Sequence, residues 1–287
     1  MVKISIIILT YNSSKYIDSL LQGLIEKFKK PINEKQIEII VADNASLDDT
    51  IIRAEKYNNH IRVINNGGNF GFAKGNNLAV KKANGEFIAF LNPDAEFKSG
   101  DIFELLEKFN DARVGVVGGK IVDYDGKREL SCGRFYFALN SLILSVGLEE
   151  KLRLRFSPKK DRQVDFVSGA FLVIRRSLFE KLNGFDENYF MYIEDSDLCY
   201  RVKMAGFRVE FCDKATIRHM GQGSSNRTFA IVNIYKGLIY FNKKYGTPFS
   251  YQFVRIMLLA KALLLVLIGK IINNKYLVET YREASKI

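Results

Sequence analysis

The stretch ISIIILTYNSS, residues 4–14, decides how the chain folds. Residues 4–9 form a continuous apolar run rich in β-branched side chains, which is typical of a central strand covered on both faces. A polar turn follows at residues 10–14, and apolar side chains then recur at helical spacing as far as Phe28. The pattern predicts a buried strand, a turn and an amphipathic helix.

The same unit recurs further along the chain. The patterns predict strands at residues 38–42, 61–64 and 87–91, and helices at residues 47–57 and 73–83. This alternation is typical of an α/β fold with a mixed, mostly parallel sheet flanked by helices. Open sheets of this kind bind ligands at the carboxyl ends of their strands. Thr10, Asn12, Asp43 and Asp94 all follow strand ends, so we expect them to converge on one edge.

The second half of the chain is less regular. Strands are predicted at residues 114–120, 166–174 and 208–212, and helices at residues 194–205 and 226–245. Residues 123–163 are charged and carry little structural signal, so we expect a mobile or acceptor-facing insertion there.

Composition excludes several classes of protein. With 287 residues, 47% of them hydrophobic and 26% charged, the chain can bury an ordinary globular core. Its three cysteines include no Cys-x-x-Cys pair, which argues against a disulfide framework or a zinc knuckle. The first apolar run is too short for a signal peptide. We therefore expect a cytoplasmic protein with free, buried thiols.

The net charge of +11 is concentrated in the last part of the chain, because residues 241–287 contain eight basic and two acidic side chains. Such a basic segment can meet nucleic acid, an anionic lipid surface or an acidic substrate. Its interior, residues 256–272, is the most hydrophobic stretch of the chain, which favours lipid and argues against nucleic acid. A span needs about 20 apolar residues, so a helix lying at the membrane interface with snorkelling lysines fits best. A helix buried in the protein or in a homodimer, and a true span, are the alternatives.

Several polar segments are candidates for chemistry. Asp43 either starts a helix or accepts a hydrogen bond from a nucleobase or a ribose. The Gly- and Asn-rich residues 65–77 either form a turn or approach a phosphate group, because glycine permits close backbone approach. Asp94, after a buried strand, is either a solvated turn residue or a ligand of a hard divalent cation. His219 precedes a Gly- and Ser-rich loop and is either a polar side chain or a second metal ligand.

Glu194 and Asp195 open a predicted helix directly after an aromatic segment, residues 185–192. Acidic side chains in a first helical turn are favourable because of the helix dipole. The helix dipole alone does not explain the aromatic residues before the acidic pair. They would exclude water from a carboxylate and raise its pKa. A general base for a hydroxyl group is the functional alternative.

Together these motifs resemble one family, the inverting glycosyltransferases of family 2 with the GT-A fold, in the rhamnosyltransferase-like branch. The resemblance runs in order over residues 4–225. The matching stretches are residues 6–12, residues 39–49, Asn69-x-Gly71-Phe72-Ala73-x-Gly75-Asn76, residues 91–94, Ser168-Gly169-Ala170, Gly184-Phe185-Asp186-Glu187, Glu194-Asp195-x-Asp197-Leu198-x-x-Arg201, and His219 with Gly221.

The resemblance implies a role for each matching residue. Thr10, Asn12 and Asp43 would hold the nucleoside of a nucleotide-sugar donor. Asn76 would face the donor, as would Asn92, which replaces the first acid of the family's Asp-x-Asp motif. Asp94 would bind Mg²⁺ or Mn²⁺, with His219 as a possible second ligand. Gly169 and Ala170 would line the acceptor site. The chain has no tryptophan, so Phe190 or Tyr192 would stack on a sugar. Asp195 would be the catalytic base, oriented by Glu194.

The implied reaction is a single displacement at the anomeric carbon with inversion, using a saccharide or lipid-linked saccharide acceptor. The implied catalytic domain covers residues 1–230, with a donor half (1–100) and an acceptor half (101–230). Residues 231–287 would be a helical, membrane-associating extension on the inner face of the cell membrane.

Two other functions remain as alternatives. A sugar-phosphate nucleotidyltransferase would need a basic, Gly-rich loop after its first strand, and residues 10–14 are not such a loop. A non-catalytic binding scaffold would not need to keep all of Asp94, Glu194, Asp195 and His219.

Overall fold

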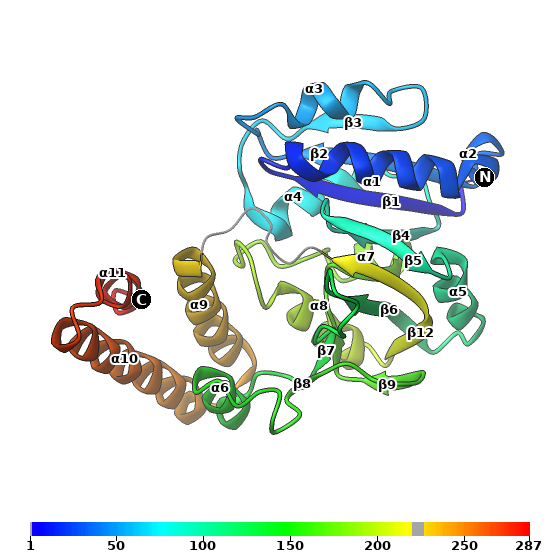
Figure 1. Cartoon of the computed structure of the whole chain (residues 1–287). Helices are drawn as coiled ribbons and strands as arrows, with labels where there is room; N and C mark the ends of the chain where they lie inside the picture. Colours follow the sequence, from blue (N-terminus) through cyan, green and yellow to red (C-terminus); the bar gives the residue numbers. More distant parts are fainter. Residues whose placement is uncertain (1, 220–226) are drawn as a thin grey trace.

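The computed structural model describes residues 2–219 and 227–287 (Figure 1). Within these ranges a nine-stranded sheet has the order β3-β2-β1-β4-β11-β6-β12-β5, with β9 paired to β12. Its strands are β1 (Ile4–Thr10), β2 (Ile37–Asp43), β3 (Arg62–Asn65), β4 (Phe87–Leu91), β5 (Ala95–Ser99), β6 (Val114–Val122), β9 (Arg162–Val164), β11 (Phe171–Arg175) and β12 (Arg208–His219). A smaller sheet contains β7 (Cys132–Gly133), β8 (Arg155–Phe156) and β10 (Phe166–Val167).

The described helices surround the main sheet. They are α1 (Ser14–Lys27), α2 (Lys29–Asn33), α3 (Thr50–Glu55), α4 (Gly71–Val80), α5 (Ile102–Glu107), a 3₁₀ turn (Lys108–Asn110), α6 (Ala138–Ser145), α7 (Arg176–Lys181), α8 (Glu194–Met204), α9 (Arg227–Tyr245), α10 (Pro248–Ile271) and α11 (Lys275–Ala284).

The mixed, mostly parallel sheet predicted from the sequence is confirmed. Strands β1 to β4, β6 and β12 run in one direction, whereas β5, β9 and β11 run in the other. Successive side chains of a strand point to opposite faces. Accordingly, Ile6 and Ile8 pack with α1 and α5 on one face, and Ile7 packs with α4 and α8 on the other. The carboxyl ends of β1, β2 and β4 lie together at one edge.

Two details of the second half differ from the predicted elements. Residues 166–174 form two strands in different sheets, β10 and β11, because the chain turns at residues 168–170 between them. Strand β12 continues past Cys212 to His219, where β6 and β5 pair with it on either side. The Gly- and Ser-rich loop predicted after His219 lies outside the described residues.

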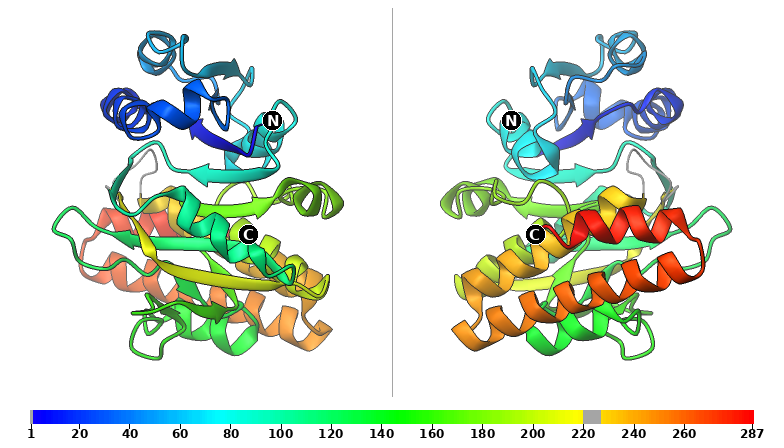
Figure 2. Two further views of the ribbon diagram at one scale, coloured as in Figure 1. Left: turned by 90° about the vertical axis from the view of Figure 1, so that its right-hand side faces the viewer. Right: turned by 90° about the vertical axis from the view of Figure 1, so that its left-hand side faces the viewer.

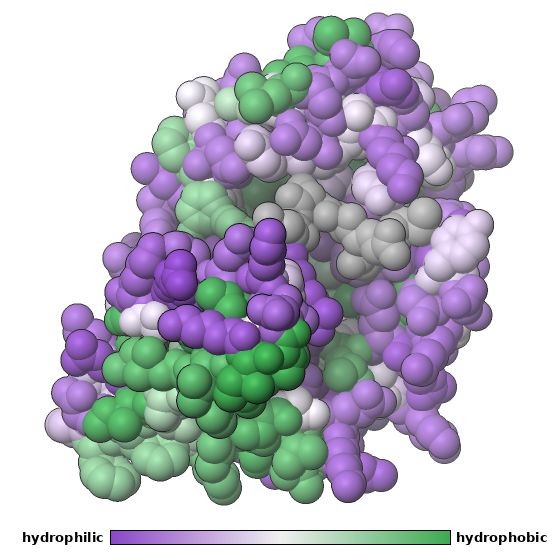
Figure 3. Space-filling model, turned by 60° about the vertical axis from the view of Figure 1, so that its left-hand side comes forward, coloured by the Kyte–Doolittle hydropathy of each residue, from purple (hydrophilic) through white to green (hydrophobic). Residues whose placement is uncertain are grey.

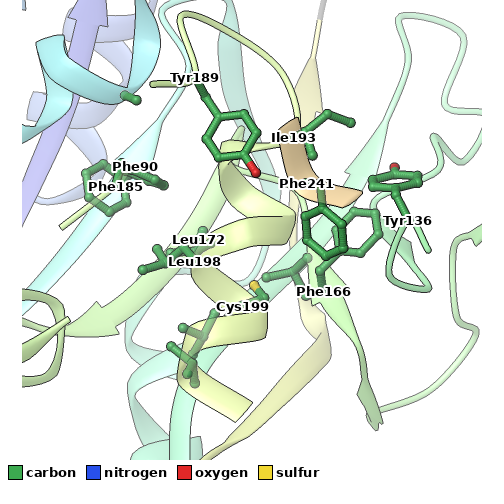
Figure 4. Packing of buried hydrophobic residues seen from close by; sticks show 14 of the residues in the cluster. Phe90, Tyr136, Phe166, Leu172, Phe185, Tyr189, Ile193, Leu198, Cys199 and Phe241 are labelled. Atoms are coloured by element: carbon green, nitrogen blue, oxygen red, sulfur yellow. The ribbon is translucent and has the colours of Figure 1, made fainter. Parts of the chain in front are cut away.

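Residues 123–163 do not form the mobile insertion that their charge suggested. They contribute β7, α6, β8 and β9, and Phe135, Tyr136 and Leu154 are buried in the core. Figure 4 shows Tyr136 beside Phe166 and Phe241, and the ring centroids of Tyr136 and Phe166 are 5.4 Å apart. The apolar side chains of this segment pack here although charged residues separate them in sequence.

The C-terminal helices join the same core. Phe241, Val254 and Leu258 are buried in the cluster that also contains residues of β4, β11 and α8. The right panel of Figure 2 shows α9, α10 and α11 as one layer of helices. Among the residues that the structure describes, no helix is long and apolar enough to cross a membrane.

Candidate functional site

A cleft of about 540 Å³ opens at the carboxyl ends of β1 and β4. It brings together seven of the residues singled out from the sequence: Thr10, Asn12, Asn92, Asp94, Phe190, Tyr192 and His219. Its remaining lining residues are Leu9, Tyr11, Ser13, Tyr16, Asn44, Asn69, Gly71, Phe72, Pro93, Met191 and Phe229. Residues 10–94 supply one wall, and the segment before α8 supplies the opposite wall.

Asp43 lies beneath the cleft floor and not on its surface. Its carboxylate is fully buried and accepts hydrogen bonds from the Thr10 hydroxyl at 2.7 Å and from the backbone N–H of Ser46 at 2.7 Å. The Ser46 hydroxyl donates a third bond, at 2.5 Å. Asp43 therefore ties the ends of β1 and β2 together.

Asn12 shapes the turn after β1. It adopts a left-handed backbone conformation, with φ of 51°, which asparagine tolerates better than most residues. Its side-chain oxygen accepts a hydrogen bond from the backbone N–H of Leu47 at 2.8 Å, and its own backbone N–H donates to Ser46. These bonds join the turns after β1 and β2 into one rim of the cleft.

The Gly-rich segment forms the contact between the two walls. Gly71 has a φ of +76°, and the backbone N–H of Phe72 donates to the carbonyl oxygen of Phe190 at 2.7 Å. Asn76, the residue expected to face the donor, points into helix α4, is buried, and donates to the carbonyl of Phe72. Asn44, which the sequence analysis did not single out, lines the cleft instead and donates to the carbonyl of Gly71 at 3.0 Å.

Asp94 and His219 face each other although 125 residues separate them in the chain, because β12 pairs with the strand that follows Asp94. Asp94 Oδ1 lies 3.3 Å from His219 Nε2, and Asn92 Nδ2 lies 3.0 Å from the same nitrogen. His219 Nδ1 lies 3.1 Å from Glu129. Burial acts to lower the pKa of His219, but the carboxylates of Asp94 and Glu129 overcome it and raise the pKa to about 9.

The residues at this point fit a divalent cation in part. Asp94 Oδ2 is buried and has no hydrogen-bond partner among the residues that the structure describes, which is an uncommon state for a carboxylate oxygen. An oxygen from Asp94 and the Nε2 of His219 could both contact one ion. Glu129 lies at Nδ1, on the other side of the imidazole from Asp94. Among the described residues, no group of three or more acidic, His or Cys side chains is suited to hold a metal. The other ligands would have to be water or substrate oxygens, as is common for Mg²⁺.

Glu194 and Asp195 begin α8 after a strained turn, in which Tyr192 and Ile193 have φ values of 71° and 73°. Such values are rare for a β-branched residue and cluster at functional sites. Burial and the neighbouring carboxylate raise the pKa of Glu194 well above its usual range. Burial also raises the pKa of Asp195, although hydrogen bonds from backbone N–H groups and a nearby arginine act against it.

Asp195 is half-buried and connects to the cleft through the turn between β10 and β11. The backbone N–H of Gly169 donates to Asp195 Oδ2 at 3.1 Å, and a Cβ at Gly169 would lie 3.2 Å from the ring of Phe72 in the cleft wall. The next residue, Ala170, accepts a hydrogen bond from the backbone N–H of Asn92 at 3.2 Å. One short turn thus lies between the acidic pair and the Asp94 side of the cleft.

Arg155 and Tyr136 are two buried neighbours of Asp195 that the sequence analysis missed. The positive charge of Arg155 acts to lower the pKa of Asp195, and the guanidinium carbon lies 5.8 Å from the Phe166 ring centre. Both residues come from the segment taken for an insertion. The sequence offered no signal that singles out Arg155, because it is one of six basic residues in residues 151–162.

This α/β sheet, with a polar cleft at its strand ends and an acidic pair behind the cleft, defines a GT-A glycosyltransferase. The chain belongs to glycosyl transferase family 2, whose family model matches residues 5–183. A second model, described as the N-terminal domain of galactosyltransferase, matches residues 155–222. The enzyme is therefore a glycosyltransferase, and neither a nucleotidyltransferase nor a binding scaffold.

Curated relatives resemble the chain over most of its length. It is 29% identical over 236 residues to rhamnosyltransferase WbbL of Escherichia coli. This match covers 78% of this chain and 85% of the relative. It is 26% identical over 242 residues to the N-acetylglucosaminyl-diphospho-decaprenol L-rhamnosyltransferase of Mycobacterium tuberculosis, and this match covers 77% of each chain. These similarities confirm the rhamnosyltransferase-like resemblance.

The fold is also similar to a solved structure, the mannosyltransferase PcManGT from Pyrobaculum calidifontis in complex with GDP-Man and Mn²⁺. The TM-score is 0.60 at 16% identity, and the match covers 98% of this chain and 84% of that chain. At this identity the similarity establishes the GT-A fold and nothing finer.

Proposed function

We propose that the enzyme transfers a sugar, with inversion, from dTDP-rhamnose or a UDP-sugar to a hydroxyl group of a saccharide or lipid-linked saccharide acceptor. Its role would be in the assembly of a cell-surface polysaccharide or glycolipid. The names of the relatives support rhamnose as the donor sugar and a diphosphate-linked lipid as carrier of the acceptor. We further propose residues 1–230 as the catalytic domain, although this boundary falls within α9.

The observation that carries the proposal is the half-buried carboxylate of Asp195, which accepts a hydrogen bond from the backbone N–H of Gly169 in the turn behind the cleft wall. Burial raises the pKa of both Asp195 and Glu194, while backbone N–H groups and the charge of Arg155 favour the ionised form of Asp195. A carboxylate with a raised pKa is a better acceptor for a proton than an ordinary one. Glu194 would act by position, because its buried side chain lies directly before Asp195 at the start of α8.

The chemistry is one displacement. The acceptor oxygen forms a bond to the anomeric carbon while the bond from that carbon to the donor diphosphate breaks. Asp195 takes the proton of the acceptor hydroxyl, and the nucleoside diphosphate leaves. Attack from the face opposite the leaving group inverts the anomeric centre. Phe190 and Tyr192 are proposed to stack on a sugar ring, and Gly169 and Ala170 to line the acceptor side.

The donor nucleotide would lie over Thr10, Asn12 and Asn44, with Asp43 supporting this rim from below. The residue expected to contact the donor from α4, Asn76, would act only through the packing of the helix. A divalent cation, Mg²⁺ or Mn²⁺, would be held by Asp94 and His219, with Asn92 beside them, and would neutralise charge on the diphosphate.

The base assignment is tested with Asp195→Asn, Glu194→Gln and the half-buried control Asp165→Asn. Release of nucleoside diphosphate should fall by about 10²- to 10⁴-fold in Asp195→Asn, while calorimetric donor binding persists. Glu194→Gln should retain far more turnover, because an amide resembles a protonated carboxyl group. Equal turnover in Asp195→Asn and the control would refute the proposed base.

The metal assignment has its own experiment. Calorimetry with Mn²⁺ and the donor nucleoside diphosphate should show at least about tenfold weaker binding of the ion in Asp94→Asn and in His219→Ala. A screen of dTDP-rhamnose and UDP-sugars, with each ion and with EDTA, identifies the donor. Unchanged Mn²⁺ affinity in both variants would exclude Asp94 and His219 as ligands.

The proposed location is the cytoplasmic side of the cell membrane, with the enzyme attached peripherally. The basic and apolar C-terminal segment supports this location, and a homodimer through the same segment is the competing explanation. Partition between membrane and soluble fractions of lysed cells, before and after a salt wash, tests it.

A further inference from the structure

Helix α10 is apolar on two opposite sides, and the protein covers only one of them. On the covered side Val254, Leu258, Ala262 and Gly269 are buried against neighbouring helices. Gly269 lies so close to α11 that an added Cβ would be 2.9 Å from Leu277. Packing within the fold therefore explains the apolar residues on this side of α10.

The other side of α10 carries an exposed stripe of large apolar side chains. They recur every three or four residues, which keeps them on one side of an α-helix. The exposed fraction is 63% for Ile256, 55% for Leu263 and 73% for Ile271. The members of the stripe are Phe249, Phe253, Ile256, Leu263, Leu264, Leu267 and Ile271, and the small side chain of Ala260 is exposed among them.

Helix α6 and the turn after it bring further apolar side chains beside this stripe. The two helices touch where the Ser145 hydroxyl lies 3.3 Å from the sulfur of Met257. Leu139, Val146 and Leu152 are all more than half exposed. The space-filling view in Figure 3 shows a broad hydrophobic area at the end of the molecule that carries these helices. We call the stripe, together with Leu139, Val146 and Leu152, the docking face.

The charge around the docking face distinguishes between possible occupants. Helix α10 contains no acidic residue. Arg255, Lys270 and Lys275 are exposed, and among the described residues none of the three forms an ion pair. A second copy of the chain would bring the same positive charge to the contact, whereas an anionic lipid surface is complementary in charge as well as apolar beneath its headgroups.

We propose that the docking face binds an anionic lipid bilayer, with α10 lying along the membrane interface. The stripe would enter the boundary between headgroups and acyl chains, and Arg255, Lys270 and Lys275 would contact anionic headgroups. Lys261 does not take part, contrary to the expectation that both lysines of residues 256–272 snorkel. It turns inward, hydrogen-bonds to the carbonyl of Ser145 and lies over the ring of Tyr235.

The proposal explains how the site could reach a substrate at the membrane. Helix α9 begins at the cleft, which Phe229 lines, and leads directly to α10. Helix α11 returns to the start of α9, where the hydroxyl groups of Thr228 and Thr280 lie 2.7 Å apart. The docking helix and the cleft are therefore joined by one packed unit. This surface gives the proposed membrane location its structural basis and does not depend on the donor or on the base.

Co-sedimentation with vesicles tests the docking face. The full chain is mixed with phosphatidylcholine vesicles, with and without phosphatidylglycerol, and compared with Leu263→Glu. The matched control is Ile52→Glu, because Ile52 is 64% exposed on α3 and lies outside the docking face. Wild type and Ile52→Glu should bind the anionic vesicles more tightly than the neutral ones, and Leu263→Glu should bind at least about tenfold more weakly. Circular dichroism should show the same fold in all three proteins.

Sedimentation velocity without lipid distinguishes lipid binding from dimerisation, in which a second copy of the chain would cover the docking face. If wild type dimerises, Leu263→Glu is monomeric and neither protein binds vesicles, then the docking face is a dimer contact and the proposal is overturned. Equal vesicle binding by wild type and Leu263→Glu, or no binding by wild type, also overturns it. Nucleoside diphosphate release with a water-soluble acceptor should be the same in Leu263→Glu and wild type, so a failure of sugar transfer would be seen separately.

Discussion

The contact between Gly71 and Phe190 holds the two walls of the cleft together, and replacing this glycine should be costly. An added Cβ would lie 2.1 Å from the carbonyl oxygen of Phe190. The same oxygen accepts the hydrogen bond from Phe72. Gly67 provides a matched control, because its φ of +78° is close to the +76° of Gly71 but its Cβ would meet nothing within 4 Å.

The size of the effect follows from these contacts. In either variant the left-handed backbone costs about 1 kcal/mol once alanine replaces glycine. At Gly71 the clash adds about 1–3 kcal/mol, and loss of the hydrogen bond from Phe72 adds about 1 kcal/mol. Gly71→Ala should therefore lower the free energy of unfolding by about 3–5 kcal/mol, against about 1 kcal/mol for Gly67→Ala.

Urea unfolding followed by circular dichroism measures both values. Calorimetry should also show weaker donor binding in Gly71→Ala, because the clash moves the wall that carries Phe190. Equal losses of stability in the two variants would show that the contact between the walls is not as close as described, and the reasoning would be refuted.

Two further predictions concern charged groups. Burial acts to raise the pKa of Asp186, but hydrogen bonds from Lys244 and neighbouring groups lower it from 3.8 to about 2. The resulting contribution to the free energy of unfolding, about 2 kcal/mol, is present above about pH 5 and is lost as the pH falls toward 2. Urea unfolding should show the loss of this contribution in wild type and not in Asp186→Asn. Arg155→Met removes a charge that lowers the pKa of Asp195, so the acidic limb of the turnover profile should move to higher pH. The exposed control Lys151→Met should leave that limb where it is, and a limb unmoved in both variants would contradict a role for Arg155 beside the base.

The fold of the first 100 residues could be predicted from the sequence because its signals are local. A buried parallel strand is a continuous apolar run, and residues 87–91 coincide with β4. The strand ends then identify Thr10 and Asp94 without knowledge of any contact. The fold of residues 101–219 could not be predicted in the same way, because β11 inserts between β4 and β6 in the opposite direction, and no local pattern specifies that order.

The residues of the candidate site could be predicted from the sequence, but their contacts could not. The sequence indicated Asp94, His219 and Asp195, but not their surroundings. Arg155 near Asp195, and Glu129 against His219, come from segments far away in the chain. The same limit applies to Asp43 and Asn76, whose polar side chains follow the expected pattern but bond within the fold. A sequence pattern reports which chemical group is present, not whether the folded chain already satisfies it.

The sequence by itself determined the α/β class, the edge of the sheet that carries the polar residues, the family, and the excess of apolar and basic residues at the C-terminus. Each of these depends on residue types at short spacing. Only the tertiary structure decided which carboxylates lose water, which partners they acquire, and which side of α10 remains uncovered. Those properties depend on burial and on charges brought together by distant strands and helices, and they set the pKa of Asp195 and the apolar surface that stays exposed on α10.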